Sequence, residues 1–73
     1  MFKIRPELLG CICRAYRIES LKMTQVEVAK ETGYTASNIN KFELGKTSSV
    51  ILLCYYMSKG LSSDEILKAV EGE

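Results

Sequence analysis

The sequence predicts an all-α protein, a compact five-helix bundle, on three observations. Apolar residues recur at helical spacing along the 73-residue chain, and no stretch alternates apolar and polar residues as a strand does. Helix-capping patterns stand between the apolar segments. Hydrophobic residues make up 47% of the chain, which is enough for one small core. We therefore expect a single domain over residues 1–73.

The most informative stretch, residues 24–45, reads TQVEVAKETGYTASNINKFELG. Thr24 is a favourable N-cap, and Glu27 three residues later completes the pattern of a capping box. Gly33 stands where a helix commonly ends in a residue with positive φ, because glycine has no Cβ to clash there. The pattern predicts a short helix between Thr24 and Gly33.

A second helix is expected over residues 36–44, directly after the first. Thr35 is its N-cap, and Ile39 and Phe42 form an apolar stripe that ends before Gly45. Two short helices joined by a tight glycine turn are the layout of a helix-turn-helix, a motif that reads DNA. This layout therefore predicts a DNA-binding function.

The helix before the motif is expected to begin near Pro6, which suits a first helical turn. Apolar residues continue from there at helical spacing to about Arg17 or Ile18. Gly10 within this helix costs about 1 kcal/mol relative to alanine. Its presence indicates either a close contact with another helix or a later true start.

The C-terminal helices are expected over residues 48–70. Residues 50–59 are apolar almost all round, which is typical of a mostly buried helix. Ser62 is a suitable cap for a last helix that continues to about Val70. We expect Leu67 and Val70 of that helix to point inward.

The residues of the central motif also resemble the Cro/C1-type (XRE-like) helix-turn-helix family of phage repressors and bacterial regulators. The resemblance covers about residues 8–60 and implies a bundle of the lambda-repressor-like type. It also implies a sequence-specific transcription regulator, of the small phage or mobile-element repressor type, that binds double-stranded DNA. The residues that stand in the family's spacing are Thr24, Gln25, Ala29, Gly33, Ile39, Phe42, Glu43 and Gly45.

In helix-turn-helix docking the second helix lies in the major groove with its N-terminal residues at the base edges. Lysine can donate to guanine, asparagine can pair bidentately with adenine, serine is permissive, and an alanine methyl can meet a thymine methyl. Many relatives carry a glutamine where this chain has Ala36, so the family's adenine contact does not carry over. The base-contact candidates are Ala36, Ser37, Asn40 and Lys41.

Phosphate contacts are expected at the start of the first motif helix and just after the second. Gln25 can present its amide and nearby backbone N–H groups to a phosphate at a positive helix end. For each lysine and hydroxyl residue the alternative is a solvated loop. The phosphate-contact candidates are Lys22, Thr24, Gln25, Asn38, Lys46, Thr47 and Ser48.

Glu43 needs a partner, because an acidic residue beside DNA is repelled unless it is paired or turned away. In the family the matching glutamate commonly pairs with an arginine of the first helix. The resemblance therefore implies a structural ion pair between Arg17 and Glu43, with Arg14 as the alternative partner.

The net charge is only +1, whereas DNA-binding domains often carry a basic excess. Few phosphate contacts favour a homodimer on a pseudo-palindromic site. The apolar excess of the last two helices offers a dimer interface, and the alternative is that these residues all belong to the core. The residues are Tyr55, Tyr56, Met57, Leu61 and Leu67.

Other classes of function find little support in the composition. The chain has no histidine, no glycine-rich phosphate loop and no paired carboxylates, so we expect no enzyme, no metal and no cofactor. No apolar run reaches the roughly 20 residues of a membrane span, so a cytoplasmic protein is expected. The three cysteines, Cys11, Cys13 and Cys54, are expected to be reduced thiols of the core.

One alternative function is a protein-interaction module that keeps the helix-turn-helix fold and binds a protein partner. The near-neutral charge supports it. So do Ala36 and Leu44, which depart from the family's usual residues on the side that meets DNA.

Overall fold

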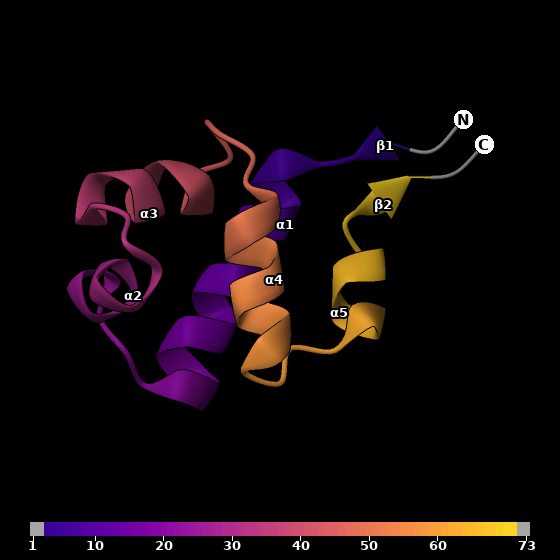
Figure 1. The fold of residues 1–73 in the computed structure, drawn as a ribbon. Coiled ribbons are helices and arrows are strands. Elements are labelled where there is room, and N and C mark those ends of the chain that lie inside the picture. Colours follow the sequence, from indigo (N-terminus) through magenta and orange to yellow (C-terminus); the bar gives the residue numbers. More distant parts are fainter. Residues whose placement is uncertain (1–2, 72–73) are drawn as a thin grey trace.

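Helices make up most of the part of the chain that the structure, a computed structural model, describes, residues 3–71 (Figure 1). Helices α2 and α3 lie at one end of the molecule, α1 and α4 in the middle, and α5 with a strand pair at the other end. The elements in chain order are β1 (Lys3–Ile4), α1 (Pro6–Tyr16), the π-helical turn η1 (Arg17–Leu21), α2 (Gln25–Thr32), α3 (Ala36–Glu43), α4 (Val50–Ser58), α5 (Ser63–Leu67) and β2 (Val70–Glu71).

The caps predicted for the central motif are confirmed. Thr24 Oγ1 accepts from the backbone N–H of Glu27 at 3.1 Å, and Glu27 Oε1 accepts from the N–H of Thr24 at 2.9 Å, which completes the capping box. Gly33 ends α2 with φ of 79°, and Thr35 caps α3 by accepting from the N–H of Asn38. These local hydrogen bonds fix where both motif helices begin.

The first helix continues further than predicted. It begins at Pro6, and after Tyr16 it widens into the π-helical turn η1, which ends at Lys22 in a left-handed conformation with φ of 53°. The α-helix itself ends within one residue of the expected Arg17, and the π-helical turn that continues it was not predicted. A π-helical turn takes up an additional residue without breaking the helix.

Gly10 explains why α1 can cross α3 closely. A Cβ at this position would lie 2.5 Å from the carbonyl oxygen of Glu43 and still closer to that of Phe42. Of the two expectations for Gly10, the close helix contact is correct. The motif is held against α1 by this backbone contact.

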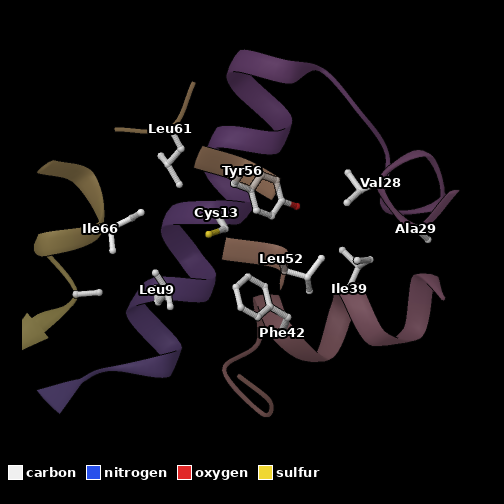
Figure 2. Close-up of a cluster of buried hydrophobic side chains, with 11 residues drawn as sticks. Leu9, Cys13, Val28, Ala29, Ile39, Phe42, Leu52, Tyr56, Leu61 and Ile66 are labelled. Atoms are coloured by element: carbon white, nitrogen blue, oxygen red, sulfur yellow. The ribbon is translucent and has the colours of Figure 1, made fainter. Parts of the chain in front are cut away.

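The core lies between α1 and α4 and extends to the motif (Figure 2). Ile39 and Phe42 of α3 point into it, together with Val28 of α2, as the apolar stripe predicted. Because both motif helices bury these side chains in the same cluster, the motif cannot rotate freely relative to α1 and α4. The remaining members are Leu9, Cys13, Ala29, Leu52, Tyr56, Leu61, Ile66 and Ala69.

Helix α4 is not mostly buried, which corrects the expectation for residues 50–59. Val50 and Ile51 are 74% and 61% exposed, and Met57 and Cys54 are exposed as well. An apolar helix is buried all round only when other elements cover it all round. In the described chain, one side of α4 has no such cover.

The C-terminal part also differs from the prediction. Helix α5 ends at Leu67, which is 60% exposed, and Ile66 and Ala69 fill the inward positions instead. Val70 lies in β2, which pairs antiparallel with β1 so that Ile4 faces Val70. The two strands are only two residues long, too short to show the alternation by which a strand is recognised in a sequence.

The cysteines do not share one environment. Cys13 is fully buried, and burial raises the pKa of its thiol to about 12, with the negative charge of Glu43 adding to the effect. Cys11 and Cys54 are exposed, so the expectation of three core thiols is correct only for Cys13. The helices described are all too short, or too polar, to cross a membrane.

Candidate nucleic-acid interface

The exposed side of α3 carries the predicted base-contact residues. Ser37 and Lys41 are exposed one turn apart, and Leu44 continues the same line one turn further. Asn40 is exposed beside this line, on the flank next to α2, and Ala36 is half-buried on that flank. The structure therefore brings the four predicted base-contact residues together on one side of one helix.

The start of α2 lies beside this side of α3. Gln25 Nε2 donates to Glu43 Oε1 at 3.0 Å and to Asn40 Oδ1 at 3.3 Å. These two bonds occupy both N–H donors of the Gln25 amide. In the described structure this amide is thus hydrogen-bonded within the protein, and the backbone N–H groups of Gln25 and Val26 stay available for the phosphate contact expected at the start of α2. Lys22 and Thr24 are exposed just before them.

Three other phosphate-contact candidates surround a single cleft on the opposite flank of α3. The cleft has a volume of about 350 Å³ and includes Asn38, Thr47 and Ser48 in its lining. Tyr34 and Ser49 join their hydroxyl groups at 3.1 Å across it, which ties the turn before α3 to the start of α4. Lys46 is exposed in the same loop. Hydroxyl and amide groups at the start of a helix suit an anion.

Glu43 is held by Arg17, and not by Arg14. Arg17 Nε donates to Glu43 Oε2 at 2.6 Å, and Arg17 Nη2 donates to Glu43 Oε1 at 3.1 Å. Arg17 Nη1 donates to the carbonyl of Met23 at 2.8 Å, so the same guanidinium also holds the segment before α2. The side chains of Arg17 and Glu43 are 9% and 1% exposed. The hydrogen bond to Glu43 raises the pKa of Arg17, which stays charged.

The five residues expected at a dimer interface differ in how deeply they are buried. Tyr56 and Leu61 are 0% and 4% exposed and belong to the core, so they cannot meet a partner without unfolding. Tyr55 is half-buried and donates its hydroxyl to Glu31 Oε1 at 2.9 Å. Met57 and Leu67 are exposed, but they lie on different helices. Helical periodicity cannot tell a core face from a contact face when both are apolar.

Sequence reasoning missed one hydrogen bond of the site, and it gave Leu44 no contact role although it placed this residue on the side that meets DNA. Leu44 is 54% exposed and shares the outward side of α3 with Lys41. Its helical spacing of one turn from Lys41 is the signal that could have added it to the base-contact candidates. The Gln25–Asn40 hydrogen bond had no such signal, because it joins side chains of two helices whose crossing is set by the core.

A search against known proteins agrees with this geometry. The family model for helix-turn-helix proteins of the Cro/C1 type matches residues 14–52. The chain belongs to this family, and it is a DNA-binding helix-turn-helix protein of the transcription-regulator class. The family is regulatory and generally not enzymatic. Neither a curated protein nor a solved structure matches the chain.

Proposed function

We propose that this protein is a sequence-specific repressor of the small phage or mobile-element type. It places α3 in the major groove of a pseudo-palindromic site and binds as a dimer. The observation that carries the proposal is the exposed side of α3, which is flanked by the start of α2 and by the hydroxyl-lined cleft. A base-reading helix between two phosphate-binding flanks is the arrangement that helix-turn-helix docking requires.

Lys41 is the residue of α3 best suited to specify a base. It is exposed at the middle of the outward side, and a lysine donates to guanine O6 and N7. Ser37 lies one turn before it and can donate or accept. Leu44 offers methyl groups of the kind that contact the methyl of thymine.

Replacing Lys41 by alanine is expected to weaken binding to the preferred site by about 1–3 kcal/mol and to relax one base position. The measurement is selection of bound sites from random duplex DNA, followed by mobility-shift titration at two salt concentrations. Lys68→Ala is the matched control, because Lys68 pairs with Glu65 at the far end of the molecule (Figure 1).

An enriched site that is the same for the parent and for Lys41→Ala would contradict the docking of α3. Failure of the parent to bind DNA even at low salt would favour the protein-interaction module. Placing the selected site upstream of a reporter gene tests repression itself, since a repressor lowers its expression.

The dimer is proposed to form through the uncovered side of α4. Val50, Ile51, Cys54 and Met57 share this side, and α4 contains no charged residue. A two-fold contact brings the same patch together from both copies, so an apolar patch without charges is self-complementary. The patch is small, which favours a weak dimer that DNA stabilises by holding both half-sites.

Replacing Ile51 by glutamate is therefore expected to abolish the preference for an inverted repeat over a half-site and to leave the unfolding midpoint nearly unchanged. Leu67→Glu is the matched control, because Leu67 is exposed to the same extent on α5. A short bismaleimide measures proximity directly: with the selected site present, it should link two copies through Cys54 and not through Cys11, which is exposed as well. Linkage through Cys11, or loss of the preference in Leu67→Glu, would place the interface elsewhere.

A further inference from the structure

A chain of hydrogen bonds runs from the buried ion pair to the exposed side of α3. Arg17 holds both oxygens of the Glu43 carboxylate, at 2.6 and 3.1 Å. Gln25 Nε2 donates to Glu43 Oε1 at 3.0 Å and to Asn40 Oδ1 at 3.3 Å. These hydrogen bonds therefore link the buried ion pair to Asn40, a side chain that the proposed function places against the bases.

The donor and the acceptor of each of these hydrogen bonds follow from the groups involved. The Glu43 carboxylate, paired with a guanidinium, can only accept hydrogen bonds, so the atom of Gln25 that faces it must be Nε2. An NH₂ group can only donate, so the atom of Asn40 that faces Gln25 must be Oδ1. The orientation of both amides thus follows from the ion pair, although their oxygen and nitrogen atoms have nearly the same shape.

This orientation determines what Asn40 offers to a base. Its Oδ1 accepts from Gln25 on the side of α2, so one of its two lone pairs is used, whereas the NH₂ group keeps both of its donors for the groove. Bidentate pairing with adenine needs both the oxygen and the NH₂ group at the base edge. The adenine contact expected for a free asparagine is therefore disfavoured.

We infer that Asn40 reads its base through its NH₂ donor, and that Gln25 is the positioning residue that turns the oxygen of this amide away from the base edge. An NH₂ donor suits guanine, which offers two neighbouring acceptors, O6 and N7, or thymine, which offers O4. It is mismatched to cytosine, which presents a donor, and to adenine, whose own amino group lies beside its N7. This inference rests on the proposed function, since it assigns a base preference to the helix that lies in the groove.

The test is site selection from random duplex DNA with three proteins: the parent, Asn40→Ala and Gln25→Ala. Asn40→Ala identifies the base position that Asn40 reads, because the preference there is lost. The parent should show guanine or thymine at that position. Gln25→Ala frees the amide to rotate, so adenine should rise there by about fivefold, the effect of one hydrogen bond. Lys41→Ala is the control and should alter a different position.

Adenine at the Asn40 position in the parent would overturn the inference while leaving the proposed function intact. The same would follow if Gln25→Ala kept the parent's preference at that position. If the parent enriched no site at all, the proposed function would fail, and the base assignment with it. The hydrogen bond itself is tested separately in the free protein, where Gln25→Ala should shift the side-chain NH₂ resonances of Asn40.

Discussion

Replacing Glu43 by alanine is expected to destabilise the protein by about 3–5 kcal/mol, because it leaves the charge of Arg17 buried without a partner. A domain of this length has a total stability of only about 5–10 kcal/mol. The variant should therefore keep only about 0–7 kcal/mol of this stability and unfold at a clearly lower denaturant concentration than the parent. The measurement is denaturant unfolding followed by far-ultraviolet circular dichroism.

The matched control for Glu43→Ala is Glu31→Ala. Glu31 pairs with Lys59 at 3.2 Å, and both side chains are about two-fifths exposed, so water can replace the partner that is lost. Its unfolding midpoint should change little. The hydrogen bond from Tyr55 and the neighbouring Lys59 lower the pKa of Glu31, but this carboxylate stays solvated without them.

A double replacement distinguishes the cost of an unpaired buried charge from the cost of lost packing. Arg17→Met combined with Glu43→Leu removes both charges and keeps much of the apolar volume, so it should be more stable than either single variant. If Glu43→Ala and Glu31→Ala unfolded at the same denaturant concentration, the buried pair would not be what holds η1 to α3.

Replacing Gly10 by alanine is expected to destabilise the protein by about 1–3 kcal/mol, although the same change in a free helix stabilises it by about 1 kcal/mol. The added Cβ would meet two backbone carbonyl oxygens, those of Phe42 and Glu43, and neither can move without shifting α3. Because Glu43 is one of them, its geometry with Arg17 should suffer as well. Thermal unfolding measures the loss.

Gly33→Ala serves as the comparison for Gly10→Ala. A Cβ at Gly33 meets nothing within 4 Å, but φ is 79° there, so the cost is backbone strain of about 1 kcal/mol. Gly10→Ala should also weaken DNA binding in the folded fraction, because it displaces α3, whereas Gly33→Ala should do so less. A stabilised Gly10→Ala would contradict the close packing of α1 against α3.

The features that the sequence predicts well are those that depend on residues near one another in the chain. The capping box of Thr24 and Glu27, the turn at Gly33 and the cap at Thr35 each need contacts over only a few residues. The inward stripe of Ile39 and Phe42 follows from helical spacing alone. The motif and the outward side of its second helix therefore follow from local residue patterns.

The features that the sequence left open depend on how the helices are packed against one another. Nothing in the apolar run of α4 distinguishes the buried Tyr56 from the exposed Ile51. The choice of Arg17 over Arg14 as the partner of Glu43 depends on where α1 crosses α3. Both are decided by which neighbouring element covers a given side of a helix. The spacing of apolar residues along the sequence does not depend on which element that is, so it cannot predict it.

The amino-acid sequence alone thus specifies the helices, their caps and the kind of motif they form, because local hydrogen bonds and apolar spacing depend on neighbouring residues. The packing of the folded chain is what brings the Gln25 amide to Glu43 and Asn40. The same packing leaves one side of α4 uncovered. Such features could not be predicted, because they depend on residues 15 or more positions apart, whose distance is set by the whole core.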